Sequence, residues 1–95
     1  MVDHMYKVDI TREAGQIIKT LPPKHYRQIV SAILALSENP AHKDSRKLSG
    51  DTGYYHVDID EYRIVYRFDK DKVYIAVIGN RIDDEVHKRF ARRKS

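Results

Sequence analysis

A few basic side chains in the second half of this sequence could do chemistry. Arg63 and Arg67 alternate with aromatic and β-branched residues, His56 precedes them, and Arg81 and His87 follow. A guanidinium can hold a phosphate through two parallel hydrogen bonds, and an imidazole exchanges protons near neutral pH. Since arginine is mostly solvent-exposed in folded proteins, this pattern is typical of a small RNA-directed surface on one face of a sheet.

The charge balance also fits a nucleic-acid partner. The formal net charge is +4 over 95 residues, and the basic residues gather in two places. Lys43, Arg46 and Lys47 lie in a central loop, whereas Lys88 begins a basic C-terminal run. Such clusters attract phosphate, although many basic tails on small proteins are only solvated.

Length and composition exclude several classes of protein. A chain of 95 residues fits one domain. The absence of cysteine excludes disulfides and thiolate metal sites, and it is most compatible with a cytoplasmic location. No apolar run approaches the ~20 residues of a membrane span, and the histidines lack the spacing of a metal site. Residues 1–5 are expected to be disordered or to be a cloning remnant ahead of a start at Met5.

The first half predicts a strand followed by two helices. Residues 6–10 alternate apolar and polar side chains, as a half-buried strand does. Thr11 is a helix cap, and apolar residues follow at helical spacing up to Leu21. Pro22-Pro23 ends that helix and begins another, which runs to Asn39. Residues 40–53 are rich in turn formers and predict a loop.

The second half predicts three strands and a short helix. The strands cover residues 54–59, 62–69 and 73–79, and a helix is expected over residues 83–93. The order βααβββα indicates an α+β fold in which a helical hairpin packs on one face of a small antiparallel sheet. Alternation along the strands then leaves the other face open, with His56, Asp58, Arg63 and Arg67 on it.

Three segments carry a family resemblance. They are Arg46–Gly50, Tyr55–Tyr66, and Val77–Arg81 with Asp84-Glu85-Val86 behind it. With them the chain resembles the RelE/ParE superfamily of bacterial toxins, and the last segment looks more like the RelE branch. That resemblance implies an endoribonuclease that cuts mRNA in the ribosomal A site and is neutralised by a cognate antitoxin. It implies no small-molecule cofactor.

The resemblance also assigns residues. The family's arginines fall on Arg63 and Arg81, and a common basic residue of the loop falls on Lys47. Other positions depart from the family: His87 replaces a tyrosine, Asn80 replaces a basic residue, and His56 and Asp58 occupy positions that usually carry two basic residues.

Metal-free RNA cleavage needs a base, an acid and cations that stabilise the phosphorane. We expect Arg63 and Arg81 to bind the scissile phosphate, and His56 and His87 to be the base and acid in either order. The residues expected to contact RNA or the ribosome are Lys43, Arg46, Lys47, Arg67 and Lys88. Each has a structural alternative; Arg63, for example, could pair with Asp58 or Glu61 across the sheet.

Two other functions remain open at this point. A ParE-like toxin would inhibit DNA gyrase by binding it and would need no proton-transfer residues. A catalytically impaired relative would retain only the binding of antitoxin or operator.

Overall fold

The computed structural model describes residues 5–48 and 52–81. The helix expected over residues 83–93, residues 1–4 and the Ser49-Gly50 part of the family segment all lie outside the described residues. Met5, the first described residue, precedes the first strand and is 49% exposed.

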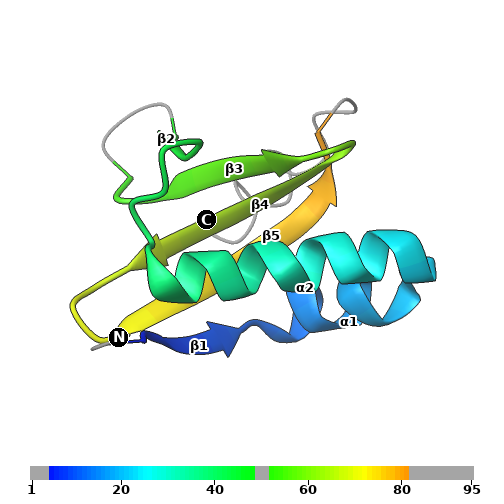
Figure 1. The fold of residues 1–95 in the computed structure, drawn as a ribbon, viewed down its shortest axis with the longest axis horizontal. Helices are drawn as coiled ribbons and strands as arrows, with labels where there is room; N and C mark the ends of the chain where they lie inside the picture. Colours follow the sequence, from blue (N-terminus) through cyan, green and yellow to red (C-terminus); the bar gives the residue numbers. More distant parts are fainter. Residues whose placement is uncertain (1–4, 49–51, 82–95) are drawn as a thin grey trace.

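Within the described residues, five strands form a single sheet that is accompanied by two helices (Figure 1). In chain order the elements are β1 (Lys7–Ile10), α1 (Arg12–Thr20), α2 (Pro23–Glu38), β2 (Arg46–Lys47), β3 (Tyr55–Ile59), β4 (Tyr62–Phe68) and β5 (Lys72–Asn80). The strand order across the sheet is β1-β5-β4-β3-β2. Neither of these helices is long and apolar enough to cross a bilayer.

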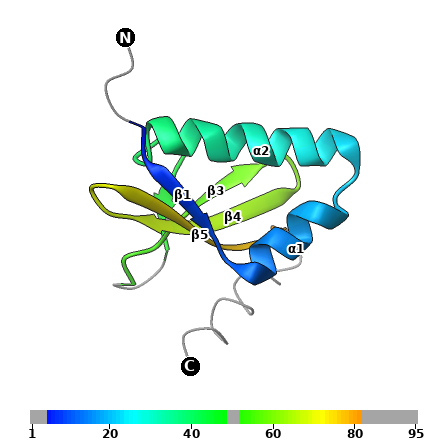
Figure 2. The ribbon, with the colours of Figure 1, turned by 90° about the horizontal axis from the view of Figure 1, so that it is seen from below.

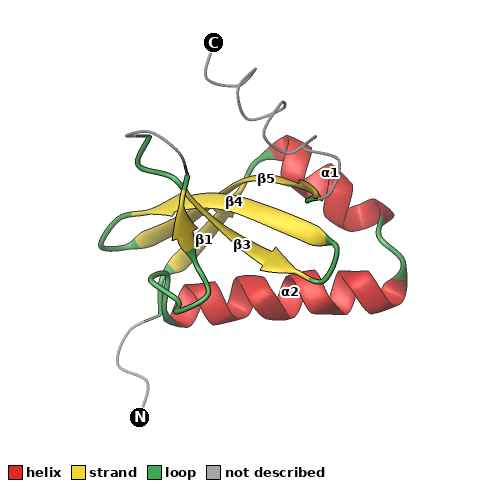
Figure 3. Ribbon diagram, turned by 90° about the horizontal axis from the view of Figure 1, so that it is seen from above, coloured by secondary structure: helices red, strands yellow, loops and turns green. Residues whose placement is uncertain are grey.

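Both helices begin and end where the sequence predicts. The Thr11 hydroxyl accepts a hydrogen bond from the Ala14 amide at 3.2 Å and caps α1. Proline at the first position of α2 loses no hydrogen bond, because that amide has no partner in a helix. Figure 2 shows α2 running along one side of the sheet, with α1 beside the N-terminal half of α2. Figure 3 shows the same layers from the opposite direction.

The prediction of an antiparallel sheet is wrong at one edge, and at the other edge it misses a strand. β1 pairs in parallel with β5, with Val8 opposite Val73, so the sheet is mixed. Alternation marks a strand but not its direction, and here two helices carry the chain away from β1 before it returns. At the other edge, β2 falls inside the predicted loop and pairs antiparallel with β3. Two charged residues are too short a run to show a period.

The face of the sheet that packs against α1 and α2 carries the main core. Its buried members from the sheet alternate as predicted, among them Val57, Ile64, Tyr66 and Ile75. From the helices come Ala14, Ile29, Ile33 and Leu36, each at most 7% exposed. The 3.6-residue period of the helices and the two-residue period of the strands therefore meet in one apolar layer.

The opposite face of the sheet, here called the distal face, is not fully open as predicted. Leu48, Val65, Ala76 and Val77 form a second buried cluster there, with Tyr54 packed against it. Ala76 and Val77 are consecutive in β5, and a bulge explains why both belong to this cluster. Val65 stands opposite Val77 and Tyr66 opposite Ile75, so Ala76 is an extra residue in β5. The Thr11 hydroxyl donates to the Ala76 carbonyl at 2.7 Å and ties this bulge to the start of α1.

Candidate functional site

The β3–β4 hairpin positions the central residues of the site. Two residues, Asp60 and Glu61, connect the strands, and Asp60 has a φ of 57°, a conformation that aspartate tolerates better than most residues. This turn fixes the register so that Asp58 lies opposite Arg63 and His56 lies opposite Val65. Directly opposed residues share a face, so all of these side chains belong to the distal face.

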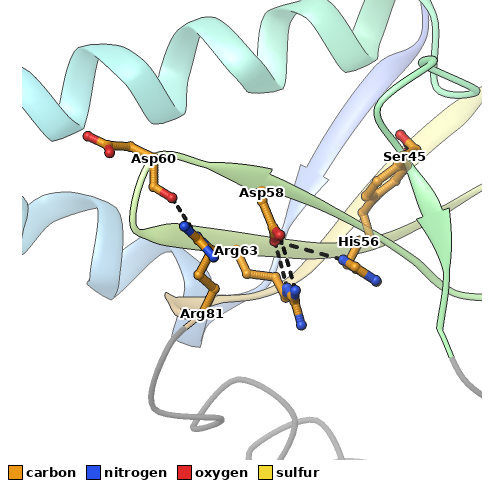
Figure 4. Close-up of polar contacts among 7 residues, drawn as sticks. Ser45, His56, Asp58, Asp60, Arg63 and Arg81 are labelled. Carbon is orange, nitrogen blue, oxygen red and sulfur yellow. Dashed lines mark hydrogen bonds and ion pairs between the residues drawn. The ribbon is translucent and has the colours of Figure 1, made fainter.

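Arg63 is held by a carboxylate. Its Nε donates to Asp58 Oδ1 at 2.6 Å and its Nη2 donates to Asp58 Oδ2 at 3.1 Å (Figure 4). This two-point geometry is the one by which arginine recognises planar anions. The bond pre-orients the guanidinium, but it also occupies two of the donors with which Arg63 could bind another anion.

His56 lies on the other side of the same carboxylate. Its Nδ1 is 3.9 Å from Asp58 Oδ1, and only 17% of the imidazole side chain is exposed. The hydrogen bond from Arg63 is the largest cause that lowers the pKa of Asp58, although partial burial opposes it. The charges of Arg63, His56 and Arg81 lower the pKa of Asp58 further. Asp58 is thus an ionised centre that all three candidate residues surround.

Arg81 reaches the site from the end of β5. Its amide donates to the Glu61 carbonyl at 3.0 Å, and its Nε donates to the Asp60 carbonyl at 2.7 Å. Both acceptors belong to the β3–β4 turn, and Figure 4 shows the bond from Arg81 to Asp60. The turn therefore fixes Arg81 at one end of the hairpin while Asp58 fixes Arg63 in its middle.

The loop cations lie beside the site along the sheet edge. Arg46 in β2 pairs with His56, and Lys43, Arg46 and Lys47 are all exposed. The buried Tyr66 hydroxyl anchors this loop, since it donates to the Pro40 carbonyl at 2.6 Å. Ser45 Oγ lies 2.5 Å from the same hydroxyl oxygen and donates to it, because the tyrosine proton is already used. Burial raises the pKa of Tyr66, so the hydroxyl keeps this proton.

The structure brings together His56, Arg63 and Arg81 of the predicted catalytic set. His87 and Lys88 lie outside the described residues. Arg67 stands apart from the group, with its guanidinium carbon 3.9 Å from the centre of the Tyr74 ring. Sequence reasoning missed Tyr74, although counting back from the four-residue turn that begins at Asp69 places it opposite Arg67.

The donor set of the site suits anions. Guanidinium groups present only donors, so Arg63 and Arg81 can bind phosphate but cannot ligate a metal. Over residues 5–48 and 52–81, no group of three histidine, cysteine or acidic residues is placed to hold a metal ion.

The sequence matches the model of a known family over residues 8–90. That family is described as the ParE toxin of the type II toxin–antitoxin system parDE. The chain belongs to this family. The match confirms the predicted membership of the RelE/ParE superfamily. No curated protein sequence shows significant similarity to the chain.

Solved structures of related toxins have the same fold. The RelBE2 toxin–antitoxin complex of Mycobacterium tuberculosis matches with a TM-score of 0.72 and 25% identity, over 83% of this chain and 94% of that one. A free variant of E. coli RelE with two arginines replaced by alanine gives 0.77 and 22% identity, over 94% and 97%. The YoeB dimer of Staphylococcus aureus gives 0.66 and 25%, over 76% and 92%. The family model thus bears the name of one branch, while these structures bear names from others.

Proposed function

We propose that this member of the family is a RelE-like endoribonuclease that cuts mRNA in the ribosomal A site without a metal or other cofactor. The observation that carries the proposal is the convergence of Arg63, Arg81 and His56 on one part of the distal face. These residues come from three strands or their ends, and a two-residue turn holds them in register. The chain would act in the cytoplasm, where its substrate is.

The chemistry assigns one role to each group. The base takes the proton of a ribose 2′-hydroxyl, the 2′-oxygen attacks phosphorus, and the acid returns a proton to the leaving 5′-oxygen. Arg63 and Arg81 stabilise the charge that builds on the phosphorane oxygens. His56 is the candidate base and His87 the candidate acid, or the reverse. For the phosphate to reach Arg63, its oxygens replace those of Asp58.

The remaining cations would guide the RNA to the site. Lys43, Arg46, Lys47 and Arg67 lie on or beside the distal face, and Lys88 is the fifth residue assigned to RNA or ribosome contact. Phosphate contacts of this kind set position and affinity and carry no sequence information. The ribosome would supply the remaining alignment of the message, since correct positioning alone lowers a barrier considerably.

A cognate antitoxin is the expected protein partner. RelE-type toxins have been solved in complex with RelB antitoxins from Mycobacterium tuberculosis and from Pyrococcus horikoshii. We expect an acidic antitoxin that covers Arg63 and Arg81 and so blocks the site, because opposite charges favour that contact.

Primer extension on an mRNA in a purified translation system tests the proposal. Wild-type protein is expected to produce new 3′ ends at A-site codons, and Arg81→Ala is expected to remove them. Arg27→Ala, on the exposed side of α2, is the matched control and should cut like wild type. A message that stays intact with folded wild-type protein would refute the nuclease.

Two observations favour ParE-like inhibition of DNA gyrase as the second candidate. The matching family model is that of ParE, and Asp58 neutralises a cation that a nuclease would need. Growth arrest that persists in an Arg63→Ala/Arg81→Ala double variant, with supercoiling inhibited in vitro, would support this candidate. A chain that arrests no growth but binds its antitoxin would instead be a relative that has kept only binding.

A further inference from the structure

A second cluster of side chains on the distal face lies away from Asp58, around the cross-strand pair of Arg67 and Tyr74. Arg67 in β4 stands opposite Tyr74 in β5, and its guanidinium covers the tyrosine ring with 3.9 Å between the guanidinium carbon and the ring centre. The tyrosine hydroxyl donates to Asp69 Oδ2 at 3.2 Å. The same carboxylate accepts from the amides of Asp71 and Lys72, each at 2.8 Å, through its other oxygen. The ring under Arg67 is therefore fixed by the β4–β5 turn.

The neighbours of this pair are aromatic and apolar. Tyr54, just before β3, packs on the second buried cluster of the distal face. Because Tyr55 pairs with Tyr66, Tyr54 comes next to Arg67 in the same row across the sheet. A guanidinium plane stacked on one ring and bordered by another is a surface on which a nucleobase can stack.

The distance to the candidate phosphate site fits a neighbouring nucleotide. Arg63 and Arg67 are four residues apart along β4 and share a face, and a strand rises by about 3.3 Å per residue. The pair thus lies about 13 Å from the phosphate site. Arg46 and His56 lie in the row between, so the path along the sheet stays basic.

A purely structural role is the alternative for Arg67 and Tyr74. A cation–π contact between two strands stabilises a hairpin whether or not RNA binds. Against a structural role alone, the pair lies on the face that carries the candidate site, and both residues are only partly buried.

We propose that Arg67 and Tyr74 form a stacking platform for a nucleobase of single-stranded RNA that flanks the scissile phosphate. This inference rests on the proposed function for its substrate class. The platform accepts any base, because stacking needs only a π face. It holds the strand at a second point, so the ribose at the scissile phosphate is aligned.

The test compares two probes by fluorescence anisotropy. One is a 2′-O-methyl oligouridine, which cannot be cut; the other is the same backbone without bases. Stacking of one base is expected to make the wild-type chain bind the first probe roughly 5- to 30-fold more tightly. Arg67→Lys keeps the charge but loses the planar group. It should bring that ratio down about fivefold or more and change the affinity for the baseless probe less than about twofold.

Two further variants complete the design. Tyr74→Leu should lower the ratio as Arg67→Lys does, whereas Arg27→Lys, the same substitution on the exposed side of α2, should leave the ratio at the wild-type value. A ratio near one for the wild type, no detectable binding, or an unchanged ratio in Arg67→Lys would each overturn the platform. Primer extension separates the two proposals. If the wild type cleaves mRNA but Arg67→Lys leaves the ratio of the two probe affinities unchanged, only the platform is rejected. If Arg67→Lys lowers that ratio but the wild type cleaves no mRNA, only the nuclease is rejected.

Discussion

Asp58 is the anion among the candidate phosphate-binding cations, and replacing it with asparagine tests how the site works. In the free chain its carboxylate takes hydrogen bonds from both Nε and Nη2 of Arg63. Asparagine has the same shape and retains one acceptor oxygen, but it has no negative charge. In Asp58→Asn an RNA phosphate would meet Arg63 without having to displace a carboxylate. We therefore expect this substitution to strengthen RNA binding.

The size of the gain follows from Coulomb's law. Two unit charges 4 Å apart interact by about 1 kcal/mol in water and by about 4 kcal/mol at an effective dielectric constant of 20. Since 38% of the Asp58 side chain is exposed, the lower end applies. We expect about 1–2 kcal/mol of improved binding, roughly 5- to 30-fold in affinity. The lost ion pair should lower the free energy of unfolding by only about 0–1 kcal/mol.

Anisotropy titrations of the 2′-O-methyl oligouridine at several salt concentrations provide the measurement. One additional phosphate contact steepens the slope of log affinity against log salt by about 0.7 for a single strand. Asp60→Asn is the matched control, because it removes the same charge from the same hairpin and asparagine tolerates the positive φ of 57°. Weaker binding by Asp58→Asn, or an equal gain in Asp60→Asn, would refute the reasoning.

Acid provides a second test of the same pair. Hydrogen bonding by Arg63 lowers the pKa of Asp58 in the folded chain. The contribution of ionised Asp58 to stability is therefore fully present above its unfolded-state pKa of about 3.9. This contribution is lost as the pH falls through its lower folded-state pKa. Urea melts of wild type and Asp58→Asn should differ at pH 7 and converge only as the pH falls through the folded pKa of Asp58, which lies below its ordinary value. A difference that stayed constant down to the lowest pH would exclude ionisation of Asp58 as its source.

Two side-chain hydroxyls that join separate parts of the fold give further predictions. Tyr66→Phe leaves the Pro40 carbonyl without its donor and should lower the free energy of unfolding in urea melts by about 1–3 kcal/mol. Amide exchange should also become faster in the loop that Tyr66 anchors. The control is Tyr26→Phe, at a side chain that is 47% exposed, and it should leave the free energy of unfolding almost unchanged. Thr11→Val removes both the helix cap and the bond to the β5 bulge and should cost about 1–2 kcal/mol, whereas the exposed Thr20→Val should be close to neutral. An equal effect of variant and control would contradict either prediction.

The parts of the fold with clear local signals were predictable. α1 has a capping threonine, α2 begins at a proline, and both carry an apolar stripe. The β3–β4 hairpin has alternation on both sides of a two-residue turn. The direction of β1 was not predictable, because its partner β5 lies more than sixty residues away in the chain and alternation is the same in either direction. The bulge at Ala76 was hidden for a related reason: it adds one residue to an otherwise regular apolar run.

The candidate site was predictable in its residues more than in its contacts. Alternation alone puts His56, Arg63 and Arg67 on one face, and counting from the hairpin turns gives Asp58 and Tyr74 as their cross-strand neighbours. Which oxygen each guanidinium binds depends on side-chain rotamers, and a sequence does not encode these locally. The bond from Arg81 to the Asp60 carbonyl is of this kind, since its acceptor is backbone.

The two candidate cations differ in what a phosphate must displace. Arg63 uses Nε and Nη2 on the carboxylate of Asp58, so a phosphate has to compete with a full negative charge. Arg81 uses Nε on a neutral carbonyl, and its two Nη groups take no part in that bond. We infer that RNA meets Arg81 first and that Asp58 then yields Arg63. On this order Arg81→Ala lowers the affinity for RNA more than Arg63→Ala does in the wild type, and the two losses become similar in the background of Asp58→Asn.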